Sequence, residues 1–122
     1  MRRALHISLL FILSVFFISC EKETPEAVVA NYTQHWYKGE LDAAKRYLVP
    51  DQRELVDKIA SLRTAEELKK LKENKIEMEI QSMQQLTDST IAVRCRVLIN
   101  DNPQTNHYHL IKIKDRWYVD IY

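Results

Sequence analysis

The spacing of apolar residues changes once along this chain, and that change limits the folds open to it. In the first half they recur every three to four residues, as in Val28, Tyr32 and Trp36, which is the spacing of one face of a helix. From Lys75 onward polar and apolar residues alternate, which is the pattern of a half-buried strand. Helices followed by strands predict an α+β domain.

Four helices are predicted in the first half. The first begins at Thr24, an N-cap residue followed by proline, and ends at Gly39, because glycine readily adopts the left-handed conformation that terminates helices. Thr64 and Glu67 form the capping box of the fourth helix, which ends by Asn74. The three helices before it are predicted at residues 25–38, 40–48 and 51–61.

The second half predicts four strands, over residues 75–80, 91–99, 105–112 and 117–122. They are separated by three polar turn segments, Asp88–Ser89, Asn100–Pro103 and Lys114–Arg116. Short connections between successive strands favour an antiparallel meander. We therefore expect N-terminal helices packed on one face of a curved four-stranded antiparallel sheet, because the apolar face of each layer needs the other as its partner.

The N-terminal segment has the three parts of an export signal. Two arginines precede an apolar run from Leu5 to Ser19, and Ser19 is a small residue placed directly before Cys20. The 16 residues from Ala4 to Ser19 are too few for a transmembrane helix, which needs about 20. The arrangement resembles the lipobox of bacterial lipoproteins; an uncleaved membrane anchor is the alternative.

The resemblance to a lipobox implies that Cys20 carries lipid chains such as palmitate and holds the protein at a membrane of the cell envelope. Glu21 stands where inner-membrane retention signals have aspartate, which favours the outer membrane. The expected organisation is a signal peptide at residues 1–19, a tether at 20–24 and one domain at 25–122. Four extended residues after the cysteine reach about 14 Å, so we expect the domain close to the bilayer.

Composition excludes several functions. Removing Arg2 and Arg3 leaves 16 of the 18 basic residues against 17 acidic ones, a net charge of −1. A nucleic-acid partner is not expected, because phosphate binding needs a basic face. Gly39 is the single glycine, which rules out glycine-rich phosphate loops. Cys95 lies in an apolar strand pattern and is expected to be a buried, unreactive thiol.

Two segments resemble the nuclear transport factor 2-like superfamily, whose members form a cystatin-like α+β cone. They are the helical pair TPEAVVANYTQHWYKGELDAAKRYLVP, at residues 24–50, and the hairpin HLIKIKDRWYVDIY, at residues 109–122. Glycine is usual in the turn of that hairpin, where this chain has Asp115 and Arg116. The chain is similar in particular to small bacterial lipoproteins of unknown function that are described as lumazine-binding. The resemblance implies a cone-like sheet but no single function, because members include enzymes, binding proteins and docking modules.

Five residues are candidates to line the pocket of such a cone: Tyr32, Trp36, His107, His109 and Trp117. Their rings could stack a flat ligand, although aromatic residues at this spacing more often form core. The two histidines lie two positions apart on one strand face and could hold a metal ion together with His35, but no acidic ligand is suitably spaced. A small ligand is therefore one option for this pocket, and no metal and no cofactor are expected.

A binding or interaction domain without catalytic activity is the favoured hypothesis. The alternative is a small pocket enzyme of the isomerase or hydrolase type. Its only candidate groups would be Tyr32, His35, His107 and Asp120. Enzymes of this kind pair a base with a group that polarises a carbonyl, and no such pair is evident in the sequence.

A protein partner or a second copy of the chain could use the sheet face opposite the helices. Exposed aromatic surface is typical of interfaces, and four residues are expected on that face: Tyr108, Leu110, Tyr118 and Tyr122. The alternative is a face covered by cross-strand charge pairs, formed by Glu77 and Glu79 with Arg94 and Arg96.

Overall fold

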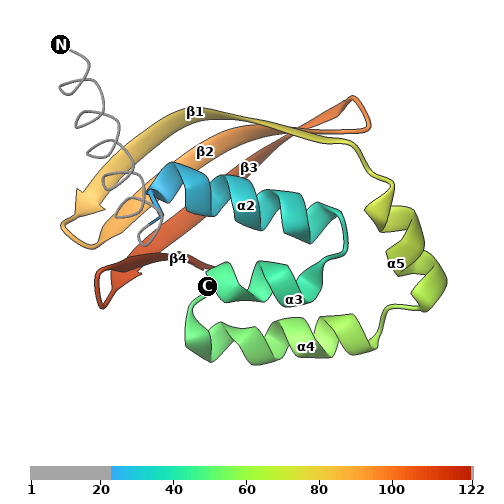
Figure 1. The fold of residues 1–122 in the computed structure, drawn as a ribbon. Helices are drawn as coiled ribbons and strands as arrows, with labels where there is room; N and C mark the ends of the chain where they lie inside the picture. The colour runs from blue at the N-terminus through green and yellow to red at the C-terminus, as the bar shows by residue number, and fades with distance from the viewer. Residues whose placement is uncertain (1–22, 122) are drawn as a thin grey trace, which may run out of the picture.

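The computed structural model describes residues 23–121, and among them every helix precedes every strand (Figure 1). The predicted signal peptide, Cys20 and Tyr122 lie outside the described residues. The elements, in chain order, are α2 (Pro25–Tyr37), α3 (Leu41–Ala44), the 3-10 turns η1 (Lys45–Tyr47) and η2 (Pro50–Gln52), α4 (Arg53–Ser61), α5 (Ala65–Lys72), β1 (Ile76–Thr87), β2 (Thr90–Ile99), β3 (Asn102–Ile113) and β4 (Arg116–Asp120).

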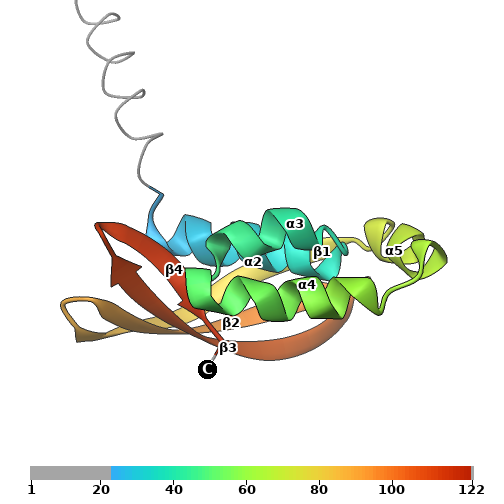
Figure 2. The same cartoon turned by 90° about the horizontal axis from the view of Figure 1, so that it is seen from below.

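The helices lie on one face of a curved, four-stranded antiparallel sheet, which confirms the predicted fold class (Figures 1 and 2). The sheet follows the chain in the order β1-β2-β3-β4. Within residues 23–121, no helix combines the length and the hydropathy that crossing a membrane requires.

Helix α2 begins and ends as its sequence predicts. The side-chain oxygen of Thr24 accepts a hydrogen bond from the Ala27 amide (3.2 Å), and Pro25 occupies the first turn. Gly39 follows the helix with a φ of +73°, a conformation that strains residues with a side chain. A Cβ at Gly39 would lie 3.1 Å from the Cβ of Leu71. Glycine therefore both ends α2 and lets α5 approach it.

Two hairpins of the sheet close with two-residue turns, Asn100–Asp101 and Lys114–Asp115, and all four residues have positive φ. Turns of this type twist in the sense that matches the strands they join. Two strands are clearly longer than predicted, because β1 continues to Thr87 and β3 begins at Asn102, whereas β4 ends earlier, at Asp120. The expected four-residue turn before β3 is in fact two residues long.

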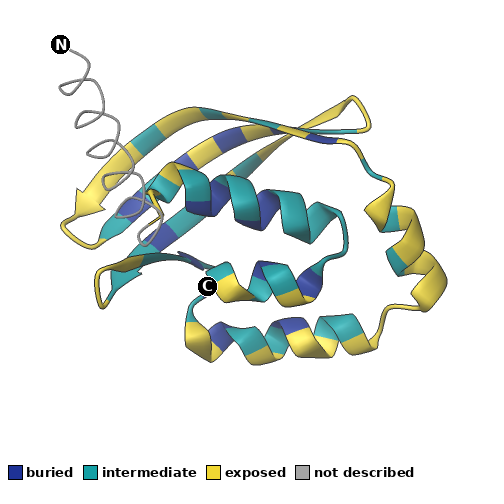
Figure 3. Ribbon diagram, viewed as in Figure 1, coloured by how far each residue is buried: buried dark blue, intermediate teal, exposed yellow. Residues whose placement is uncertain are grey.

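The core lies between α2 and the inner face of the sheet. Val28, Val29 and Tyr32 of α2 pack against strand residues that point inward at alternate positions. Figure 3 shows these buried positions on α2 and the strands, whereas α5 is exposed along much of its length. Cys95 is a fully buried free thiol, as predicted, and burial raises its pKa. The buried strand residues are Ile76, Ile91, Val93, Cys95, Val97, Leu110 and Val119.

The outer edge of β4 is covered by the segment between η1 and η2. Leu48 forms a parallel bridge with Val119, and the Val49 amide donates to the Val119 carbonyl (3.1 Å). The buried side chain of Gln52 donates to Asp120 Oδ1 (2.6 Å) and accepts from the backbone amide of Ile121 (2.9 Å). A strand edge that would otherwise present unpaired backbone groups is thereby closed.

The predicted orientation of Tyr108 and Leu110 is wrong. Both point toward the helices rather than away from them, since Leu110 is 0% exposed and the Tyr108 hydroxyl bonds to Thr33 of α2. The register of the sheet explains the difference, because it places Leu110 opposite the buried Ile91. Apolar residues occupy both faces of this strand, so alternation alone did not identify the inner one.

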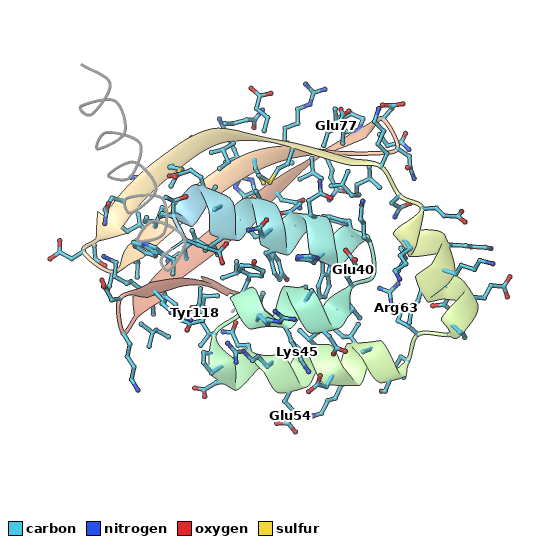
Figure 4. The ribbon with its side chains drawn as sticks, viewed as in Figure 1. Glu40, Lys45, Glu54, Arg63, Glu77 and Tyr118 are labelled. Carbon is cyan, nitrogen blue, oxygen red and sulfur yellow. The ribbon has the colours of Figure 1, made fainter. Side chains whose placement is uncertain are left out.

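The outer face of the sheet therefore carries less aromatic surface than expected. Tyr118, labelled in Figure 4, is on that face opposite Ile111, and His109 is opposite Asp120. On the other half of the sheet, Glu79 lies opposite Arg96. Glu77, however, lies opposite Leu98, and Arg94 lies opposite Ser82, so one of the expected cross-strand charge pairs is in register. The use of this face by a partner stays a prediction.

Candidate functional site

A groove opens where the second half of α2 faces β3, and we call it the aromatic groove. Its volume is about 310 Å³. Helix α2 contributes three aromatic side chains, Tyr32, Trp36 and Tyr37, and β3 contributes the segment 105–108. The groove therefore joins an apolar wall from the helix to a polar wall from the strand.

Tyr32 stands at the centre of the aromatic wall. Its ring stacks on Trp36 with the centroids 5.9 Å apart and meets Tyr108 edge-on at 5.8 Å. Stacked and edge-to-face arrangements are the favourable ones for aromatic pairs. Tyr32 is only 5% exposed, whereas Trp36 is half-buried. Trp36 is thus the ring on which a flat ligand could stack from the open side.

The polar groups of the groove bond mainly to one another. Tyr108 Oη accepts from Thr33 Oγ1 (3.0 Å) and from Asn106 Nδ2 (3.0 Å). The Asn106 amide also donates to Tyr37 Oη (2.8 Å), and Gln104 Nε2 donates both to that same phenol and to Asn106 Oδ1 (2.9 Å). Each phenol oxygen accepts two hydrogen bonds and retains its own proton as a donor. The network holds these side chains in place and still offers donors to a ligand.

The two inner phenols stay uncharged at neutral pH. Burial raises the pKa of Tyr108 to about 12, because the ionised form would lose its hydration. Burial also raises the pKa of Tyr32, and the neighbouring phenols Tyr108 and Tyr37 add to that effect. The groove therefore presents neutral amides and phenols, which donate and accept hydrogen bonds but do not act as bases near pH 7.

The structure brings two of the five predicted pocket residues to the aromatic groove with their side chains, Tyr32 and Trp36. His107 borders the groove but is exposed and shares the outer strand face with His109, because the side chain of Tyr108 between them points inward. His109 lies instead on the outer face of the sheet, with Nδ1 3.9 Å from Asp120 Oδ2. Trp117 lies under Lys112, whose Nζ is 5.1 Å from the ring centroid.

The candidate catalytic groups do not converge. His35 points away from the groove, where Nδ1 donates to Glu40 (3.2 Å) and the ring stacks on Tyr47. Asp120 is held by Gln52 at the far edge of the sheet. In the part of the chain from residue 23 to 121, no three His, Cys, Asp or Glu side chains are grouped as metal ligands.

Sequence reasoning missed several residues of the groove. Thr33, Tyr37, Gln104, Asn106 and Tyr108 form the polar network, yet none was a candidate for the pocket, and Tyr108 was expected on the opposite sheet face. For the residues of β3, the sequence signal that could have identified them is the two-residue turn at Asn100–Asp101. Such a turn fixes the register of β2 against β3, and the register shows which residues of β3 point inward.

Comparison with known proteins agrees with this architecture. A family described as "Domain of unknown function (DUF4878)" matches residues 18–120. Comparison with curated proteins gives no match.

Two solved structures are similar to the chain. A "Putative NTF2-like transpeptidase" from Campylobacter jejuni is 24% identical with a TM-score of 0.62, over 82% of this chain and 100% of that one. An NTF-2 like protein of unknown function from Shewanella oneidensis MR-1 is 15% identical with a TM-score of 0.53, over 75% of this chain and 88% of that one. Likenesses at this level of identity confirm the predicted nuclear transport factor 2-like fold and transfer no activity.

Proposed function

The chain belongs to the family described as "Domain of unknown function (DUF4878)", and we propose that it is a lipid-anchored, non-catalytic binding protein of the cell envelope. Its ligand is small, planar and uncharged, and the aromatic groove is the binding site. Recognition combines stacking on Trp36 with hydrogen bonds donated by the phenols that face it.

One observation carries the choice of ligand class, namely the network that joins Tyr37, Asn106 and Tyr108. All three side chains are neutral, and their geometry is fixed by mutual hydrogen bonds before any ligand arrives. Binding sites with a few placed polar groups and an aromatic wall are typical for small molecules. A charged ligand would find no compensating charge in this network.

A non-catalytic role is supported by the chemistry of the groove. The two inner phenols have raised pKa values and favour the neutral form. A pocket enzyme of the isomerase or hydrolase type needs a base beside an oxyanion donor. The carboxylate candidate, Asp120, is bonded to Gln52 at the sheet edge instead.

The lipid anchor is supported by the sequence around Cys20, where a short apolar run ends in a small residue followed by cysteine. A Cys20→Ser substitution removes the acylated sulfur. We expect the variant to leave the membrane fraction or to retain its uncleaved signal, which intact-mass spectrometry would distinguish. Density-gradient separation of the two membranes tests the outer-membrane location. Unchanged mass and unchanged sedimentation would contradict acylation.

The ligand class can be tested with lumazine, a flat heteroaromatic compound suggested by the family resemblance. We expect lumazine to bind the detergent-solubilised protein at a one-to-one ratio in calorimetry and to quench the fluorescence of Trp36. Replacing Trp36 by leucine should weaken the binding that calorimetry measures, because the stacking surface is lost. Stacking of one ring on an aromatic side chain is worth roughly 1–3 kcal/mol, or about fivefold to 150-fold in affinity.

Trp117 provides the matched control, because it is the other tryptophan and lies outside the groove. A Trp117→Phe variant should bind lumazine as the native chain does. Mass spectrometry of small molecules that co-purify with the native chain, but not with the Trp36 variant, would identify the natural ligand. The proposed site fails if both variants behave alike, and the non-catalytic role fails if a bound compound is turned over.

A further inference from the structure

A second groove lies between α3 and α5, with a volume of about 630 Å³, and we call it the basic groove. It is lined by residues of the turn after α2, of α3, of η1 and of α5, elements that Figure 1 shows at the end of the molecule where α5 lies. It shares no lining residue with the aromatic groove.

Four cationic side chains line the basic groove: Lys38, Arg46, Lys69 and Lys72. Within residues 23–121, none of the four forms an ion pair. They come from three different segments of the chain, so the fold itself gathers them.

The two carboxylates of the groove are already engaged. Glu40 accepts a hydrogen bond from His35 Nδ1 (3.2 Å), and Asp42 lies 3.4 Å from Lys45 Nζ. Lys45 also bonds to Asp57 of α4 (2.8 Å). Figure 4 shows Glu40 at the turn between α2 and α3, and Lys45 on the side of α3 that faces α4. The groove is thus left with an excess of unpaired positive charge.

The floor of the basic groove is apolar. Ala43 and Leu68 line it, and Leu68 is only half-buried. Helix α5 has no buried residue and approaches the rest of the fold at Gly39, where Leu68 and Leu71 lie against the backbone. Figure 3 shows the same helix exposed along its outer side. A wall held by two leucines can adjust to a bound molecule at little cost in packing.

We propose that the basic groove binds a single-chain amphiphilic anion, that is, a phosphate head joined to an alkyl chain. The cations attract and hydrogen-bond the head, because charge-assisted hydrogen bonds are the strong ones. The apolar floor takes the first part of the chain. This site is separate from the aromatic groove and does not depend on the proposed uncharged ligand.

The test uses the full acylated chain in neutral phosphatidylcholine nanodiscs, titrated by calorimetry against empty nanodiscs. Octyl phosphate, well below its micelle concentration, is the probe. Inorganic phosphate lacks the chain, and octyl glucoside has the same chain with an uncharged head. We expect octyl phosphate to bind at a one-to-one ratio, about tenfold or more tighter than either of the other two.

Helix α5 offers a matched control, because Lys69 and Lys72 line the groove and Lys70 does not. The double variant Lys69→Gln and Lys72→Gln should weaken octyl phosphate about fivefold or more, while lumazine binding in the aromatic groove is unchanged. Lys70→Gln should leave both affinities within about twofold.

Three results would overturn the proposal. Equal affinity for inorganic phosphate would mean that the groove takes any anion, and equal affinity for octyl glucoside would mean that charge has no role. Equal weakening by Lys70→Gln would mean that only the overall charge of α5 matters. Each result leaves the lumazine experiment intact, so failure of this site and failure of the proposed function are distinguishable.

Discussion

In the aromatic groove the polar side chains bond to one another, whereas the cations of the basic groove have no ion-pair partner among residues 23–121. The first groove lies against the core of α2 and the sheet, and the second is walled by a helix without a buried residue. A satisfied network selects a ligand by shape and by neutral hydrogen bonds. Unpaired charge attracts a ligand over a longer range, and that attraction weakens as the salt concentration rises. The comparison therefore predicts different responses to mutation, pH and ionic strength.

The largest contrast is expected between two leucines. Leu110 is fully buried in the core between the sheet and α2, whereas Leu68 is half-buried in α5. Leu110→Ala should lower the free energy of unfolding by about 2–5 kcal/mol, because it leaves a cavity in the core. Leu68→Ala should lower it by only about 1 kcal/mol. Urea denaturation of both variants measures the difference, and similar losses would show that α5 is as firmly packed as the core.

The next effect concerns the network itself. Tyr108→Phe removes the oxygen that accepts from Thr33 and Asn106, and Thr33 is 0% exposed. A buried donor left without its acceptor costs about 1–3 kcal/mol. Tyr118→Phe on the outer face is the matched control and should change stability by less than about 0.5 kcal/mol. If the two variants are equally stable, the network does not hold the aromatic groove together.

A smaller effect, confined to the basic groove, is expected at Gly39. Gly39→Ala places a methyl group 3.1 Å from Leu71 Cβ at a φ of +73°, so the loss of stability should be about 1–2 kcal/mol. The added methyl should also push α5 outward. Hydrogen exchange should become faster in α5, and octyl phosphate should bind more weakly while lumazine binds as before. An equal loss at both grooves would contradict the separation between them.

The smallest effect is an alkaline loss of stability. Burial raises the pKa of Tyr108 to about 12 in the folded chain, whereas an unfolded tyrosine ionises near pH 10. This contribution to stability is complete below about pH 10 and is lost as the pH rises toward 12; at about pH 10.5 the loss is below about 1 kcal/mol. Denaturation curves between pH 9 and about 11 should show a flatter decline for Tyr108→Phe than for the native chain. If the free energy of unfolding falls equally with pH in both proteins, a group other than Tyr108 causes the alkaline loss of stability.

The sequence was sufficient for the layout of the fold. Thr24 and Gly39 have local chemistry that ends a helix wherever it occurs, and the structure confirms both ends of α2. The alternation that begins at Lys75 predicted the sheet, because a period of two leaves few other solutions. These features depend on neighbours in sequence, so no knowledge of the fold is needed to see them.

The grooves could not be predicted in the same way. The facing of β3 depends on its register with β2, and apolar residues such as Leu110 and Ile111 occupy both of its faces. Lys69 and Lys72 share one face of α5 at a spacing of three, yet the cations they join, Lys38 and Arg46, lie far away in the chain. A site assembled from distant segments has no local signature.

The closing of β4 by Leu48, Val49 and Gln52 has a consequence for how the chain is made. Gln52 and Asp120 are 68 positions apart, so the contacts between residues 48–52 and β4 can form only after β4 has joined the sheet. Contacts so distant in sequence form late, because a long loop has to be closed first. For a chain proposed to be exported to the cell envelope, the domain can therefore close only after its last strand is available.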